Sequence, residues 1–164
     1  NNMNVQKYWT QVLSALGDIT GAKNIDAFQR KHIAALSPAA KAETVTAANV
    51  ITASESGKTF YLALEGGFAS TLPAPAAGLK FRFVVSVSPT TAYTIVTNGS
   101  ANIIKGGTIE IAGTASPYIN NGDLITFVAN TAVVGDWVEL QSDGTSWFLS
   151  GMCSADGGIT LAST

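Results

Sequence analysis

The stretch SDGTSWFL, residues 142–149, predicts the turn and the returning strand of a β-hairpin. Asp143 and Gly144 suit the centre of a two-residue type I′ turn, because both central positions of that turn need a positive φ. Such a turn places apolar side chains together on one face of the hairpin. The pairs predicted on this core face are Ser142–Thr145, Leu140–Trp147 and Val138–Leu149.

The opposite face of the hairpin is mixed in character. Glu139 pairs there with Phe148, and Trp137 and Gln141 lie on the same side. Aromatic side chains on the solvent side of a sheet are typical of protein interfaces, where they carry much of the binding energy. We therefore expect Trp137, Glu139 and Phe148 to form an oligomer interface. The alternative is that a neighbouring loop or the N-terminal region of the same chain covers them.

The sequence around this hairpin also has the period of two that β-strands show. KTFYLALE (58–65) and KFRFVVSVS (80–88) alternate apolar and other residues, and pairs such as Gly106-Gly107 and Asn121-Gly122 indicate turns. This pattern predicts an antiparallel β-sandwich or barrel, of which a jelly-roll-like arrangement is one member. The further strands expected are 93–97, 108–112, 124–129, 136–141 and 146–150.

The N-terminal part has a helical period instead. Residues 5–16 carry apolar side chains at spacings of three and four, and residues 25–36 repeat the pattern up to Ser37-Pro38. Two short helices are marginal alone, so their stripes must rest on the body of the chain or on a partner. We expect a helical arm at 1–41 and a β domain at 42–164. The arm residues expected to bind a partner are Tyr8, Trp9, Val12, Leu13, Leu16, Arg30 and Lys31.

Charge is scarce and unevenly distributed. Of the 164 residues only 12% are charged, about half the usual share for a soluble domain. Residues 1–41 carry a balance of +3, whereas residues 42–164 carry −5. Five cations with interspersed acids do not resemble a polybasic arm, so we expect no nucleic-acid partner. No apolar run reaches the roughly 18 residues of a membrane span, and we expect no membrane partner.

Motifs for catalysis are missing from the sequence. The only histidine, His32, lies on the stripe of the second predicted helix, and the only cysteine is Cys153, so zinc lacks ligands. We expect no enzyme activity, no cofactor, no metal and no small-molecule substrate. The remaining possibility is a two-carboxylate hydrolase, because sequence spacing does not reveal the separation of acids. The acids available for it are Glu110, Asp123, Asp136, Glu139 and Asp143, most of them beside turns where Asp supports the backbone.

Two stretches of the β region are similar to a small domain of tailed-bacteriophage structural proteins. They are SGKTFYLALEGGFASTLPAPAAGLKFRFVV (56–85) and GDWVELQSDGTSWFLSG (135–151). In that family a run of the type LPAPxxGLxFxFVV precedes a hairpin of the type GDxVxLxSDGTxWxxxG. Together they span roughly residues 50–151. The resemblance implies a virion protein, and such modules occur in both head and tail proteins.

The absence of long repeats favours the head, because fibre and spike proteins usually carry repeats or coiled-coil heptads. A compact chain with a short arm is similar to capsid decoration, or cement, proteins. The resemblance implies a homotrimer on the outer capsid surface that bridges copies of the major capsid protein, made in the cytoplasm of a bacterial host. The alternative is a tail or receptor-binding module, in which Trp137, Phe148 or Tyr118 stacks on the sugar rings of a host glycan.

Overall fold

The computed structural model of the chain describes residues 41–114 and 116–164. The two predicted helices and the predicted docking residues from Tyr8 to Lys31 lie outside these residues. Lys41–Thr164 form one compact unit, which is mainly β.

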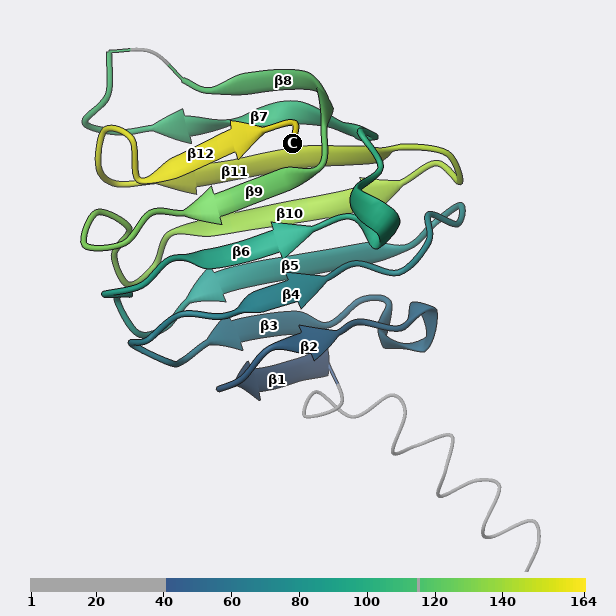
Figure 1. The fold of residues 1–164 in the computed structure, drawn as a ribbon, viewed down its shortest axis with the longest axis horizontal. Helices are drawn as coiled ribbons and strands as arrows, with labels where there is room; N and C mark the ends of the chain where they lie inside the picture. The colour runs from purple at the N-terminus through teal and green to yellow at the C-terminus, as the bar shows by residue number, and fades with distance from the viewer. Residues whose placement is uncertain (1–40, 115) are drawn as a thin grey trace, which may run out of the picture. The chain divides into compact units, whose positions relative to one another are not determined.

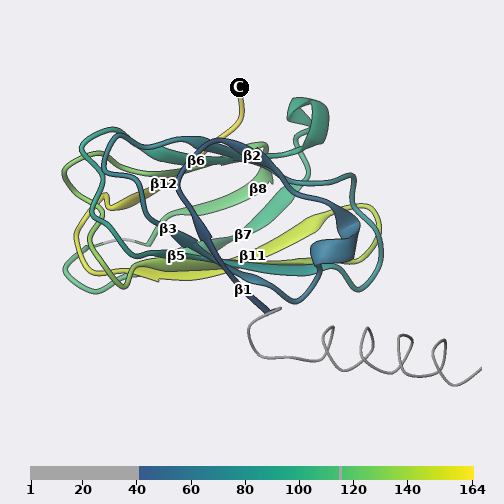
Figure 2. The ribbon, with the colours of Figure 1, turned by 90° about the horizontal axis from the view of Figure 1, so that it is seen from below.

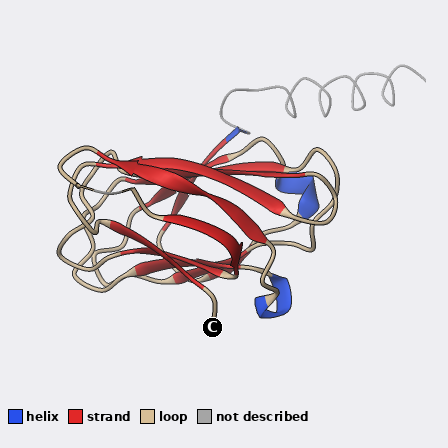
Figure 3. Ribbon diagram, turned by 90° about the horizontal axis from the view of Figure 1, so that it is seen from above, coloured by secondary structure: helices blue, strands red, loops and turns tan. Residues whose placement is uncertain are grey.

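The described residues form two sheets that face each other as two layers (Figures 2 and 3). In order across sheet A, the seven strands are β1 (Ala42–Val45), β3 (Thr59–Leu62), β5 (Lys80–Val85), β10 (Trp137–Ser142), β11 (Trp147–Cys153), β7 (Ile104–Glu110) and β8 (Tyr118–Gly122). The five strands of sheet B are β12 (Ile159–Ala162), β9 (Leu124–Phe127), β6 (Tyr93–Val96), β4 (Ala69–Thr71) and β2 (Asn49–Val50). Two single-turn helices, η2 (Ala53–Glu55) and η3 (Asn98–Ser100), lie in the connections.

The prediction of antiparallel sheets is wrong, because both sheets are mixed. Among the described residues, five of the ten strand pairs are parallel and five antiparallel. The first six strands alternate between the sheets, so β1, β3 and β5 fall in sheet A and β2, β4 and β6 in sheet B (Figure 1). A chain that crosses to the other layer and returns re-enters its sheet in the same direction. This winding produces four of the five parallel pairs, and the fifth joins β7 to β11.

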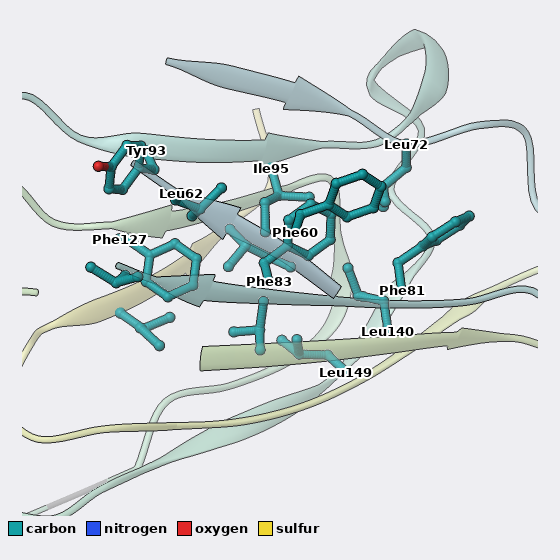
Figure 4. Packing of buried hydrophobic residues seen from close by; sticks show 14 of the residues in the cluster. Phe60, Leu62, Leu72, Phe81, Phe83, Tyr93, Ile95, Phe127, Leu140 and Leu149 are labelled. Atoms are coloured by element: carbon teal, nitrogen blue, oxygen red, sulfur yellow. The ribbon is translucent and has the colours of Figure 1, made fainter. Parts of the chain in front are cut away.

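The core lies between the two layers and is rich in aromatic rings (Figure 4). Phe60 and Phe83 stack from adjacent strands of sheet A, with ring centroids 5.3 Å apart. Burying one such side chain stabilises the fold by about 1.5–3 kcal/mol. The predicted alternation is confirmed inside β3 and β5, whereas Leu64 and Val87 lie beyond the strand ends and are exposed.

The hairpin β10–β11 keeps its predicted faces but not its predicted register. Val138, Leu140, Trp147 and Leu149 are buried in the core, as expected. The turn, however, is a four-residue loop, so Ser142 pairs with Trp147 instead of Thr145. The observed pairs on the two faces are Leu140–Leu149, Gln141–Phe148 and Glu139–Ser150, a shift of two residues from the prediction.

The side chain of Asp143 explains the longer loop. Its Oδ1 accepts hydrogen bonds from the N–H groups of Thr145 and Ser146, both at 2.8 Å. The bond from Ser146, followed by those from Thr145, lowers the pKa of the Asp143 carboxyl from its ordinary value. Gly144 in this loop has a φ of 104°, which glycine adopts without strain, and short Asp side chains commonly bond the backbone two residues on in such loops. Since a shift of two preserves the facing of every side chain, the apolar pattern alone could not distinguish the two registers.

Gly106 and Gly107 do not form the predicted turn but lie inside β7. Gly106 has a φ of 127°, and a Cβ added there would lie 2.1 Å from the carbonyl oxygen of Leu149. The pairing of β7 with β8 is irregular between Ile104 and Gly106. Glycine is therefore needed here for close approach within a bulged strand, not for a chain reversal.

Sheet A ends at β1 in a small ion-pair cluster. Lys58 Nζ lies 2.6 Å from Glu43 Oε2 and 3.0 Å from Glu55 Oε1. The hydrogen bond to Glu43 raises the pKa of Lys58, although partial burial acts against it. Because Glu43 is in register with Phe60, it lies on the core side of the edge strand. The end of sheet B at β2 is only two residues long.

We expect Gly106→Ala to lower the free energy of unfolding by at least about 2 kcal/mol, because it adds backbone strain to a steric clash. The matched control is Gly66→Ala, whose added Cβ meets nothing within 4 Å and whose φ needs no glycine. Urea unfolding of both variants measures the difference. Equal stabilities would contradict the close approach at Gly106.

Candidate interaction surface

The outer face of sheet A, which is the side turned away from sheet B, carries a continuous row of apolar side chains. Each member is the register partner of the next across five adjacent strands. We call it the apolar row, and it consists of Tyr61, Val84, Trp137, Met152 and Ile109. At about 4.8 Å between strands it spans roughly 19 Å. Tyr61 and Ile109 at its two ends are 39% and 65% exposed.

Charged groups lie beside the apolar row on the same face. The Arg82 guanidinium stacks over the Trp137 ring, with its carbon 4.1 Å from the ring centroid. Lys80 Nζ lies 3.0 Å from Glu139 Oε1, which also accepts a hydrogen bond from Gln141. Exposed cation–π contacts and ion pairs each contribute about 1 kcal/mol or less. They hold the side chains in place more than they stabilise the fold.

Phe148 lies in a further row of the same face, between polar neighbours. Its register partners are Gln141 on one side and Lys105 on the other. The Phe148 side chain is 48% exposed, and Tyr118 on the edge strand β8 is 72% exposed. Tyr118 joins this face because it pairs with Gly107, the register partner of Ser150. The face thus combines exposed rings with cations.

The predicted interface residues lie together on this surface. Trp137, Glu139 and Phe148 all project from the outer face of β10 and β11, although Glu139 faces Ser150 and not Phe148. Their role as an interface stays a prediction. The predicted arm residues lie outside the described part of the chain, so their contacts with this face are not described.

Sequence reasoning missed four members of the apolar row: Tyr61, Val84, Met152 and Ile109. Each is visible in the sequence as an outward residue of a period-two strand. The signal that joins them is the register between strands far apart in the chain, such as β5 with β10. Local periodicity does not contain that information.

Most acids of the proposed two-carboxylate site support the backbone instead. The buried Asp136 accepts hydrogen bonds from the N–H groups of Val133 and Ser154, both at 2.9 Å. The buried Asp123 accepts two from Thr164 at the end of the chain. Asp143 holds its own loop, as described above. The interpretation of these Asp residues as structural is therefore confirmed.

The described residues also include the single cysteine and the side chains that could bind a metal ion. Cys153 is fully buried, and burial raises the pKa of its thiol. No group of three or more His, Cys, Asp or Glu side chains is placed to hold a metal ion in residues 41–114 and 116–164. Across the same residues, no helix has the length and apolar character needed to cross a bilayer.

We expect Asp136→Ala to lower the free energy of unfolding by about 2–4 kcal/mol, because it removes a buried carboxylate and leaves two partly buried N–H groups without their acceptor. Glu65→Ala removes an exposed acid and should change it by less than about 0.5 kcal/mol. Thermal or urea unfolding compares the two. Asp136→Ala behaving like its control would show that these hydrogen bonds do not support the fold.

No protein-family model matches the chain, and no curated protein sequence is significantly similar to it.

Proposed function

We propose that the chain is a structural bacteriophage virion protein that decorates and stabilises the capsid as a homo-oligomer. The observation that carries the proposal is where the two phage-like stretches lie in the fold. Of the strands of sheet A, residues 56–85 contain β3 and β5, and residues 135–151 contain β10 and the first five residues of β11. These four strands are consecutive neighbours in sheet A. Segments that are 50 residues apart in the sequence thus form one unit, and its outer face carries most of the apolar row.

The outer face of sheet A approaches the size of a standard protein interface and carries aromatic side chains of the kind that is enriched there. Seven strands about 4.8 Å apart and six residues of about 3.3 Å cover roughly 30 by 20 Å, or roughly 600 Å². A standard interface buries about 800 Å² on each partner. In this proposal Trp137, Phe148 and the apolar row lie at the contact between copies. Glu139 contributes through its ion pair with Lys80.

In this proposal the N-terminal arm attaches the protein to the capsid. Residues 1–41 carry a basic balance and two predicted apolar stripes, including Tyr8, Trp9 and Leu13. In a homotrimer, three such arms would bind the major capsid protein together, and the high effective concentration would strengthen weak individual attachments. The proposed site of action is the outer capsid surface of a virion. The proposal includes a jelly-roll-like fold, since the two-layer packing is compatible with it.

We expect Phe148→Asp to dissociate the oligomer while leaving the fold intact, because it places a charge at the contact on a half-exposed position. Light scattering should give a monomer mass, and the unfolding midpoint should barely change. Val50→Asp, on sheet B and 72% exposed, is the matched control and should keep the oligomer. An oligomer that survives Phe148→Asp would contradict the proposed interface.

We expect a chain lacking residues 1–36 to remain a folded oligomer that no longer binds capsids, because the β unit contains its own core. Cosedimentation with undecorated capsids measures binding, and light scattering measures the oligomer. The full chain is the control. If the shortened chain still binds capsids, the arm is not the docking element.

A second candidate is a tail or receptor-binding module that recognises a host-surface glycan. The observation that favours it is the exposure of Phe148 and Tyr118 on a face that also carries Lys105. Aromatic rings of this kind can stack on sugars. Light scattering separates the two candidates, since a monomer at every concentration would leave the rings free for a glycan and remove the support for assembly.

A further inference from the structure

The strands β8 and β12 are the last strands of their sheets and lie at one end of the molecule (Figure 1). A cleft of about 370 Å³ is lined by residues at this end. We call it the β12 cleft. One wall is β12, and the other is the end of β7 with the start of the segment leading to Tyr118. The residues that line it are Glu110, Ser116, Pro117, Asp156, Gly157, Ile159, Thr160 and Leu161. Its position is separate from the apolar row.

One end of the β12 cleft is acidic. Glu110 is almost fully buried, and its Oε1 accepts a hydrogen bond from Gly157 N–H at 3.1 Å. A Cβ added at Gly113 would lie 2.5 Å from Glu110 Oε2 and 3.2 Å from Asp156 Oδ1. The two carboxylates therefore both lie close to Gly113, and the Glu110 side chain packs so tightly against it that a larger residue there would collide.

A positive charge would be favourable at this end of the cleft. Within residues 41–114 and 116–164, no Lys or Arg forms an ion pair with Glu110 or Asp156. Two neighbouring carboxylates repel each other, and a cation between them replaces that repulsion with attraction. Two acids are too few for a well-held metal ion, and the described residues contain no larger metal-binding group there. An ammonium or guanidinium group suits the space better.

The wall formed by β12 is the last strand of sheet B, and β12 also contacts β8 of sheet A. Val128 N–H donates to the Gly158 carbonyl at 3.0 Å, and the register continues to the pair Leu161–Ile125. In an antiparallel pair the backbone groups of alternate residues point towards the partner strand and away from it. The N–H and C=O of Leu161 therefore point away from β9. Within residues 41–114 and 116–164 no other backbone group bonds to them, so they can pair with an extended chain, as in strand addition to a sheet edge.

We propose that the β12 cleft binds an extended peptide segment of a partner protein through a Lys or Arg side chain and a backbone contact to Leu161. Gly157, beside the acidic end, and Leu161 are four residues apart, roughly 13 Å along a strand. A peptide of four or five residues covers this length and places its cation between Glu110 and Asp156. Pro117 and Leu161, which are both partly exposed, provide an apolar wall for its neighbouring side chains. The proposal goes beyond capsid decoration and does not depend on it.

The test uses the full chain and an acetylated, amidated pentapeptide, Thr-Val-Lys-Val-Thr, with Gln in place of Lys as the control peptide. We expect the Lys peptide to bind at least about tenfold more tightly, because its ammonium pairs with two carboxylates. Calorimetry measures both affinities. Amide hydrogen exchange of Leu161 should slow in the complex. Equal affinities, no binding, or unchanged exchange at Leu161 would overturn the proposal.

Variants of the chain separate the cleft from general charge effects. Asp156→Asn, at an exposed position, should abolish the preference for the Lys peptide, whereas Glu65→Gln removes an exposed acid elsewhere and should keep it. The same titration on a chain lacking residues 1–36 tests for a competing occupant. Binding seen only after that deletion would assign the cleft to the chain's own N-terminal segment and overturn the proposal.

Discussion

The hairpin β10–β11 is the constraint on which the rest of sheet A depends. It pairs with β5 on one side and β7 on the other, and so joins the wound N-terminal strands to the C-terminal ones. Its Trp147 and Leu149 fill the core while Phe148 between them faces outward. A slip of one residue would exchange these faces, bury Phe148 and expose the tryptophan. The register of this hairpin therefore determines both the core and the proposed interface.

Much of the fold could be predicted from local patterns, because burial has a period of two in strands. The core positions of β3, β5, β10 and β11 followed from that period. Three features did not. The hairpin register differs by two because the side chain of Asp143 supports a longer loop. The parallel pairs depend on which sheet each strand joins, and periodicity does not encode it. Gly106 is read as a turn residue unless the carbonyl of Leu149 beside it is known.

The outer face of sheet A and the β12 cleft also differ in how far local sequence patterns could predict them. Trp137, Glu139 and Phe148 could be assigned to one face because they belong to one hairpin. Their neighbours Val84 and Ile109 lie on strands distant in sequence, and only the pairing of β5 and β7 with the hairpin brings them together. The β12 cleft had no local signal, since Glu110 and Asp156 are 46 residues apart. Both surfaces are products of the sheet order.

The ion-pair cluster at β1 has a consequence for fibre growth. A sheet can extend from molecule to molecule only if both of its edges accept a new strand. A strand added beside β1 would remove Glu43 and Lys58 from water, which is costly for charged groups. At the same end of sheet B, β2 offers only two residues for pairing. Copies joined at β8 or β12 would thus present their guarded edges outward. Neither sheet could therefore be extended through both of its edges, which disfavours continuous sheet growth in a strand-rich chain.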